Sequence, residues 1–419
     1  MIGFGISIFL ILVALTIPQG MVTLGFLWVL WHFRRPLPDR RNGLKTAIVL
    51  CLRGRDPFLE KCLESVLTQD YPEYRLHIVV DNRQDPAWGV AESLVERYGE
   101  DRVCVEILEQ RHRTCSLKCS SLAQAIERLD ESVEVVALVD ADTMAHPTWL
   151  QELVAPLADE HVGAATGNRW YMPVGGSWSA LVRYLWNAAA VVQMYWYGVA
   201  WGGTLVVKRK LLEQFDLLDQ WRRAFCEDTM LYRELGKHGY RMKFVPSLMM
   251  VNREDCTLGI CFSWMRRQLL NMRLYHPLWP LVLLHGFGTT LLLAVAVVWT
   301  AVALLRHDWP TALWCGGGLA VYELIMVSLL ILLELAVRRI VRSHGESTAW
   351  LSAKTMLRLV PAIALTQVVY TFALIGAQFA RKVDWRGVCY RVNGPWDIHR
   401  LNDPLHDGNA LSGVEGHSL

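Results

Sequence analysis

Four stretches of the sequence are almost wholly apolar, and each is long enough to cross a membrane. They cover residues 2–33, 281–305, 312–335 and 356–380. A helix of about 20 apolar residues spans the hydrocarbon core of a bilayer. The first stretch lacks the basic start and the small-residue cleavage pattern of a signal peptide, so the sequence predicts an N-terminal transmembrane anchor over residues 1–33.

Basic residues beside these stretches predict the orientation of the chain, because cytosolic flanks of membrane helices are enriched in Lys and Arg. The first stretch is followed by Arg34, Arg35, Arg40, Arg41 and Lys45, which place the next domain in the cytosol. A second cytosolic loop is marked by Arg338, Arg339 and Arg342. Four crossings would leave the C-terminal tail outside, yet its basic residues predict that it lies inside: Arg381, Lys382, Arg386 and Arg391. One stretch, for which 356–380 with its Pro361 is the first candidate, is then re-entrant or interfacial.

Between the first two apolar stretches, strand-like runs alternate with amphipathic helical patterns. The runs are 46–52, 76–81, 103–108 and 133–140. The helical patterns are 56–69, with Asp56 as the expected N-cap, 88–98 and 117–129. Such alternation predicts an α/β domain with a mixed, mostly parallel sheet that is covered by helices on both faces. Ligands of these sheets bind at the carboxyl ends of the strands.

The chain as a whole therefore divides into five parts. After the anchor come a cytosolic domain over 43–253, amphipathic interface helices over 254–279, about three transmembrane or re-entrant helices over 280–380, and a polar tail over 381–419. A hydrophobic fraction of 53% combined with a charged fraction of 20% fits this hybrid of membrane and soluble parts. The net charge of +2 argues against a nucleic-acid partner. The ten Cys form no CxxC pair, which favours reduced thiols in a cytosolic compartment over disulfides or zinc.

Two of the expected strands end in acidic residues. One ends at Asp81, and the other runs into the pair Asp140 and Asp142. Two carboxylates at one strand end can bind a hard divalent cation, which prefers oxygen ligands and bridges phosphates. The alternative is that Asp142 or Thr143 caps the next helix.

Asp228 stands at the start of a helical pattern over 229–238 and has two interpretations. It is an N-cap, or it is a general base that takes a proton from an acceptor hydroxyl. Lys118 opens a helix within a small polar stretch, where a cation and backbone N–H groups suit a diphosphate; otherwise it is a solvated surface lysine. Two glycines in the run Trp201-Gly202-Gly203-Thr204 indicate close approach of the backbone to another group.

An aromatic and basic segment precedes the second apolar stretch. Its candidate substrate-binding residues are Trp264, Arg266, Arg267, Gln268 and Arg273. An interfacial helix whose arginines contact lipid headgroups would have the same pattern, and one helix can serve both purposes on different faces.

Taken together, these motifs resemble those of the family 2 glycosyltransferases, which have a GT-A (Rossmann-like) fold. A strand-ending Asp, an Asp-x-Asp, a Glu-Asp and a Gln/Arg-x-x-Arg-Trp motif follow one another in that family. Here they match Asp81, Asp140 with Asp142, Glu227 with Asp228, and a rearranged segment 264–273. Residues 53–57 and 65–72 are similar to the family's first strand and helix, so that the likeness covers about 44–276.

Within that family the chain is more similar to ceramide glucosyltransferases than to cellulose or hyaluronan synthases. It is short, has one N-terminal span, and its segment 384–391 is similar to the end of those enzymes. It departs from the polymerase pattern, because no Gln-x-x-Arg-Trp follows Glu227 and Asp228. The resemblance implies transfer of a single sugar from a UDP-sugar to a membrane lipid. A processive polysaccharide synthase and a non-catalytic sugar-nucleotide-binding protein stay as alternatives.

The resemblance also implies a role for each candidate residue. Asp81 would hold the nucleotide base and Asp140 the ribose side, while Asp142 would bind Mg²⁺ or Mn²⁺. Lys118 and one or more of the arginines at 266, 267 and 273 would neutralise the diphosphate. Asp228 would deprotonate the acceptor, so that the anomeric configuration inverts. The expected partners are the UDP-sugar, the lipid acceptor and the bilayer, with no obligate protein partner evident.

Overall fold

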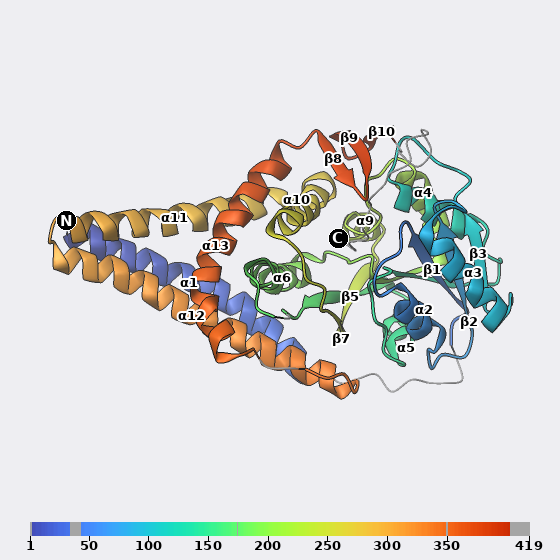
Figure 1. The fold of residues 1–419 in the computed structure, drawn as a ribbon, viewed down its shortest axis with the longest axis horizontal. Coiled ribbons are helices and arrows are strands. Elements are labelled where there is room, and N and C mark those ends of the chain that lie inside the picture. The colour runs from blue at the N-terminus through green and yellow to red at the C-terminus, as the bar shows by residue number, and fades with distance from the viewer. Residues whose placement is uncertain (1, 34–42, 174, 349–350, 403–419) are drawn as a thin grey trace.

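The computed structural model describes residues 2–33, 43–173, 175–348 and 351–402. Figure 1 shows a rounded α/β domain from which a bundle of three long helices extends to one side. These helices are α1 (Ile2–His32), α11 (Trp279–Leu305) and α12 (Trp309–Ser343). All three are long and apolar enough to cross a membrane, as is α13 (Ala353–Gln378). The basic residues Arg34, Arg35, Arg40 and Arg41 and the end of the tail, 403–419, lie outside the described residues.

The α/β domain contains a seven-stranded sheet in the order β3-β2-β1-β4-β6-β5-β7. Only β6 runs antiparallel to its neighbours β4 and β5, so the prediction of a mixed, mostly parallel sheet is confirmed. The apolar runs of β1 and β4 are buried on both faces because helices cover both sides. The strands are β1 (Thr46–Leu52), β2 (Tyr74–Val80), β3 (Val103–Ile107), β4 (Val135–Val139), β5 (Val162–Tyr171), β6 (Thr204–Lys208) and β7 (Arg241–Asn252).

Two hydrophobic cores lie on opposite faces of this sheet. One contains α2 (Leu59–Leu67), α3 (Pro86–Tyr98) and α5 (Trp149–Val154), and the other contains α4 (Leu117–Glu127). Helix α2 was predicted to begin at Asp56 as its N-cap, but it begins later. Its N-cap is Phe58, and the carboxylate of Asp56 binds Arg386 instead. The remaining elements of the domain are η1 (Ala155–Ala158), α6 (Trp178–Tyr197), α7 (Arg209–Gln214), α8 (Leu217–Trp221), α9 (Leu231–Lys237) and α10 (Leu258–Tyr275).

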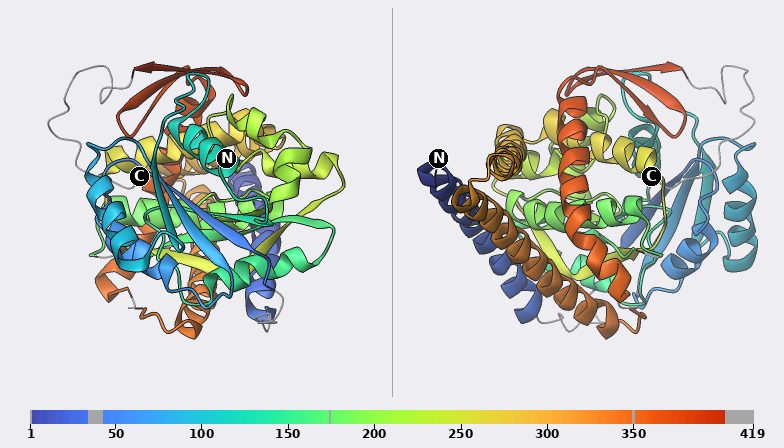
Figure 2. Two further views of the ribbon diagram at one scale, coloured as in Figure 1. Left: turned by 90° about the vertical axis from the view of Figure 1, so that its right-hand side faces the viewer. Right: turned by 60° about the vertical axis from the view of Figure 1, so that its left-hand side comes forward.

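Helix α13 lies at a steep angle to the three-helix bundle, as Figures 1 and 2 both show. It packs against α6 and α10 of the α/β domain. Near its first turn, Arg358 donates a 3.2 Å hydrogen bond to the carbonyl of Gly176. At its other end, Arg273 of α10 donates to the carbonyls of Ala377 and Gln378 at 2.7 and 2.6 Å. Both ends of α13 are therefore held by the α/β domain.

Most of the described part of the polar tail is folded. It forms a three-stranded antiparallel sheet of β8 (Lys382–Trp385), β9 (Val388–Gly394) and β10 (Asp397–Asn402). Val388 and Tyr390 of β9 are at most 1% exposed and belong to the core around α4. The tail sheet thus covers the α/β domain, on the same side as the ends of the strands β1 and β4.

Candidate active site

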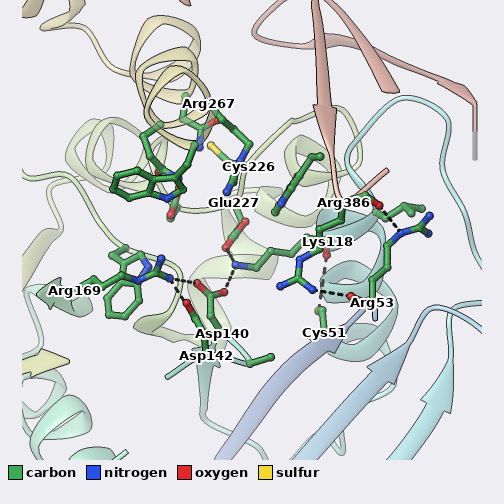
Figure 3. A pocket seen from close by; sticks show the side chains of 18 of the residues that line it. Cys51, Arg53, Lys118, Asp140, Asp142, Arg169, Cys226, Glu227, Arg267 and Arg386 are labelled. Carbon is green, nitrogen blue, oxygen red and sulfur yellow. Dashed lines mark hydrogen bonds and ion pairs between the residues drawn. The ribbon is translucent and has the colours of Figure 1, made fainter. Parts of the chain in front are cut away.

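A polar cavity of about 190 Å³ lies where β1, β2 and β4 end. Its walls are completed by α4 and α10 and by the turn between β8 and β9 (Figure 3). Asp81 follows β2, and Asp140 and Asp142 follow β4, so parallel pairing through β1 brings all three to one edge of the sheet. Most of the predicted site residues line this cavity: Asp81, Lys118, Asp140, Asp142, Asp228, Trp264, Arg267 and Gln268.

Lys118 is the centre of the charge network in this cavity. It lies in the first turn of α4, whose N-cap Ser116 accepts a hydrogen bond from the N–H of Cys119. Its Nζ lies 2.8 Å from Asp140 Oδ1 and 2.7 Å from Glu227 Oε1. Burial alone would lower the pKa of Lys118, but the two carboxylates raise it well above its ordinary value. Lys118 is therefore a half-buried cation fixed by two carboxylates and not a solvated surface lysine.

Arg169 of β5 bridges the two carboxylates of the Asp-x-Asp pair. Its Nη2 lies 3.2 Å from Asp140 Oδ2 and 3.4 Å from Asp142 Oδ1. Burial would raise the pKa of Asp140, yet Lys118 and Arg169 hold it below its ordinary value. The pKa of Asp142 is instead raised to about 6, because burial and the charge of Asp140 outweigh Arg169.

This donor set fits a divalent cation such as Mg²⁺ or Mn²⁺. The two carboxylates face the cavity from one short loop, and such ions are commonly held by one or two carboxylates together with the phosphates of a substrate. Asn252, which donates 3.1 Å to Asp142 Oδ2, fixes the orientation of the second carboxylate. Asp140 and Asp142 would hold the ion.

The two glycines after Trp201 are required by close packing at the bottom of the cavity. A Cβ atom at Gly202 would lie 2.1 Å from Glu227 Oε1. At Gly203 it would lie 2.7 Å from Asp140 Oδ2 and closer still to the Trp201 ring. The backbone therefore approaches the carboxylates as closely as the sequence pattern indicated.

Asp228 is held in one orientation by three hydrogen bonds. Its Oδ2 accepts from the N–H of Gly202 at 2.9 Å. Its Oδ1 accepts from the N–H and the hydroxyl of Thr229 at 2.6 and 2.9 Å. The helix that follows starts only at Leu231 with Met230 as its N-cap, so the N-cap interpretation of Asp228 is wrong.

Helix α10 presents different residues to the cavity and to α13. Trp264, Arg267 and Gln268 line the cavity. The buried Nε1 of Trp264 has no hydrogen-bond acceptor among the described residues. Arg266 faces the other way, with its side chain against Gly376 of α13, and Arg273 caps the end of that helix. The structure thus brings three of the five predicted residues of this segment into the cavity and leaves two outside.

Arg267 is a half-buried cation in the wall of the cavity. No ion pair to it occurs within the described ranges, and its guanidinium lies 4.7 Å from the Trp385 ring centroid. Burial, together with the charges of Arg169 and Arg386, lowers its pKa to about 10. A half-buried guanidinium with two other arginines nearby is suited to binding an anion, and a diphosphate offers the oxygens that it can contact in pairs.

Several residues of the site could not be identified from motifs. Arg386 lies in the turn between β8 and β9 and reaches back to Asp56 and to the carbonyl of Arg53. Arg53 pairs in turn with Asp81, which Arg111 also contacts at 2.7 Å. The only signal for Arg386 was the likeness of 384–391 to the end of related enzymes. Arg169 stands in a strand without any motif around it.

A second cavity, of about 300 Å³, lies where the four long apolar helices meet α6 and α10. It is mainly apolar and is formed by α1, α6, α10, α11, α12 and α13. Five lining residues besides Asp228 are shared with the polar cavity, so the two meet there: Trp186, Ala190, Met194, Trp201 and Gln268. Asp228 lies at this junction.

The chain is similar in sequence to two groups of curated proteins. A ceramide glucosyltransferase of Komagataella phaffii is 36% identical over 78 residues, 18% of this chain and 15% of that protein. The hyaluronan synthase of Streptococcus pyogenes is 33% identical over 136 residues, 32% of this chain and 31% of that protein. Hyaluronan synthase 3 of Homo sapiens is 25% identical over 262 residues, 50% of this chain and 46% of that protein. The matches span less than half the length of each relative.

Among solved structures, a mannosyltransferase of Pyrobaculum calidifontis in complex with GDP-Man and Mn²⁺ aligns with 89% of this chain and 99% of its own, with a TM-score of 0.47 and 18% identity. A family model covers far more of the sequence than these relatives do, since it matches residues 8–395 and so includes most of the anchor, the cavity residues and the strands β8 and β9. The chain belongs to glycosyl transferase family 21.

Proposed function

We propose that this chain transfers a single sugar from a UDP-sugar to a hydroxyl group of a membrane lipid, with inversion at the anomeric carbon. One observation carries the proposal: a polar cavity that suits a sugar nucleotide and an apolar cavity between membrane helices meet at Asp228. A soluble acceptor would have no need of the apolar cavity.

The polar cavity is the proposed donor cavity, and its cations are placed to neutralise a leaving diphosphate. Lys118 and Arg267 both line this space. Negative charge that develops on the leaving group is stabilised most by groups that are already in position. A bound Mg²⁺ or Mn²⁺ would supply further positive charge next to the same phosphates. Asp81 also lines the cavity, and we assign it to the nucleotide base, as the resemblance implies.

Asp228 is the proposed general base. It would take the proton of the acceptor hydroxyl while the hydroxyl oxygen bonds to the anomeric carbon and the bond from that carbon to the diphosphate oxygen breaks. Because acceptor and leaving group lie on opposite faces of the sugar, the configuration inverts. The three hydrogen bonds that Asp228 accepts keep its carboxylate at the junction of the two cavities.

The attachment of α13 supports a topology with three crossings. Helices α1, α11 and α12 form the bundle, and α13 is fastened to the α/β domain at both ends, so it would lie on that side of the membrane. The tail then lies on the same side as the α/β domain, in agreement with its basic residues. The positive-inside bias places this side in the cytosol.

A processive polysaccharide synthase is the second candidate, and the similarity to hyaluronan synthases favours it. The decisive experiment incubates the purified full chain with Mn²⁺, a panel of UDP-sugars and total membrane lipid, followed by mass spectrometry of the lipids. We expect one lipid class to gain a single sugar mass. A ladder of growing chains without a modified lipid would favour the synthase.

A pair of variants tests the acceptor cavity. Ala189 lines it, whereas Ala301 is an exposed position of α11 outside it. Tryptophan at position 189 would fill part of the cavity, so Ala189→Trp should lower lipid transfer strongly and leave UDP binding intact. Ala301→Trp should have no effect. Equal activity of both variants would contradict the assignment of this cavity to the acceptor.

A further inference from the structure

Three side chains that can bind metals converge between the α/β domain and the end of the membrane bundle. His146 and Glu152 belong to the segment after β4, and His344 is the C-cap of α12. One ligand atom of each lies within 4.8 Å of the others. The side chains of His344 and Glu152 are 3% and 2% exposed, and His146 is buried as well. The cluster is separate from the cavity residues described above.

Hydrogen bonds at the opposite ring nitrogens fix the tautomer of each histidine. His344 Nδ1 lies 3.0 Å from the carbonyl oxygen of Ile340, and because a carbonyl only accepts, this nitrogen carries the hydrogen. Thr148 donates its hydroxyl to Glu152 at 2.6 Å, so its oxygen accepts at 3.1 Å from Nδ1 of His146. In each neutral imidazole the lone pair is therefore on Nε2. His344 Nε2 faces Glu152 Oε1 at 3.3 Å.

We propose that His146, Glu152 and His344 bind a divalent transition-metal ion of the Zn²⁺ type, with water as the fourth ligand. Two imidazole nitrogens and one carboxylate are an established donor set for zinc. Histidine ligands of metals donate their other N–H to a carbonyl or a similar acceptor, as both do here. The rings stack with centroids 3.6 Å apart and an interplanar angle of 29°, so metal bonds of about 2.0–2.1 Å require one imidazole to turn out of the stack.

The ion would connect the α/β domain, which contains His146 and Glu152, to the end of α12, which carries His344. His344 ends α12, and the same loop is bound by Arg253, which donates 2.8 Å to the carbonyl of Ser347 and lies 3.5 Å from Glu346. Tyr322 and Leu333 of α12 line the apolar cavity. A metal at the end of α12 therefore fixes the position of that cavity against the α/β domain, whatever molecule the cavity holds.

The test measures bound metal in the full chain, purified in detergent without chelators and without a polyhistidine tag. Elemental analysis should find about one zinc per chain in the wild type and less than a tenth of that in His146→Ala and in His344→Ala. His399→Ala, at an exposed position, and Asp142→Ala, in the donor cavity, should keep the zinc. Loss of zinc in Asp142→Ala but not in His344→Ala would place the ion in the donor cavity and overturn the proposal.

A second measurement covers the case in which the alanine variants do not fold. Wild-type chain stripped with a chelator should unfold at a lower temperature and regain its stability with one equivalent of Zn²⁺. Co²⁺ added instead should give the visible absorption of a four-coordinate site. If stripped wild type binds neither ion at micromolar concentration, the cluster is an imidazolium–carboxylate ion pair and the proposal fails.

Discussion

Arg386 donates hydrogen bonds of 3.0 Å to both carboxylate oxygens of Asp56, a residue 330 positions earlier in the chain. Arg386 has a φ of 51° and Gly387 a φ of 75°. A two-residue hairpin with positive φ at both positions is a type I′ turn, which few residues other than Gly, Asn and Asp occupy readily. The turn points Arg386 into the donor cavity, and the pairing with Asp56 holds it there.

Replacement of Arg386 by alanine should weaken both the fold and the binding of the donor. Asp56 is 1% exposed, and an unpaired carboxylate at such a site costs about 3–5 kcal/mol. We expect a lower unfolding temperature and a higher Kd for UDP, measured by thermal unfolding and calorimetry. Arg391→Ala, at an exposed position of β9, is the matched control. Similar effects of the two changes would show that Arg386 does not contribute to the donor site.

Asp228→Asn should keep UDP binding and lose sugar transfer. The amide has nearly the same shape as the carboxylate but cannot accept a proton, and a positioned base contributes about 10²–10⁴-fold to the rate. Transfer is measured as labelled sugar in the lipid fraction. Asp219→Asn, on the exposed surface of α8, serves as control. Full activity of Asp228→Asn would exclude this residue as the base.

Asp142→Ala should abolish the dependence of nucleotide binding on a divalent cation. The change removes one of the two carboxylates that face the cavity from the loop after β4. Titration with UDP in the presence and absence of Mn²⁺ should give two different Kd values for the wild type and one weak value for the variant. An unaltered titration would mean that the ion is held elsewhere.

Cation binding at this loop should also depend on pH. Burial and the neighbouring Asp140 raise the pKa of Asp142 to about 6, and only the deprotonated carboxylate binds a cation. Apparent affinity for Mn²⁺ in the presence of UDP should therefore be nearly constant above about pH 7 and fall by up to about tenfold per pH unit below about pH 6. Affinity that stays level down to pH 5 would contradict this.

Arg267→Met and Arg266→Met form a matched pair on adjacent positions of α10. Methionine keeps most of the apolar stem but removes the charge, which faces the donor cavity only at position 267. Charged hydrogen bonds contribute about 1.5–3 kcal/mol each, so the Kd for UDP should rise about 10- to 100-fold in Arg267→Met. Arg266→Met should change it little. A larger rise of the Kd for UDP in Arg266→Met than in Arg267→Met would instead assign phosphate binding to Arg266.

The sequence predicted those parts of the site that depend on local order along the chain. Asp81, Asp140 and Asp142 follow buried strands, and parallel pairing necessarily brings such positions together. Helical periodicity could not distinguish Arg267 from Arg266 or Arg273, because the helix meets both the cavity and α13, and the orientation depends on packing. Arg169 and Arg386 were missed as site residues for a similar reason. Both reach the cavity through pairings between distant segments that no local pattern records.

The tail hairpin has a consequence for how the molecule can be made and divided. Residues 382–402 leave the ribosome only after the long apolar helices α1, α11, α12 and α13, yet they bury Tyr390 in the core around α4 and deliver Arg386 to the cavity. The donor site is thus completed by the last described segment of the polypeptide. A fragment limited to residues 43–253 would expose the surface that β9 covers, and we expect it to aggregate. Adding residues 382–402 in trans as a separate peptide would test directly whether these three strands can complete the site without being covalently joined to the rest of the chain.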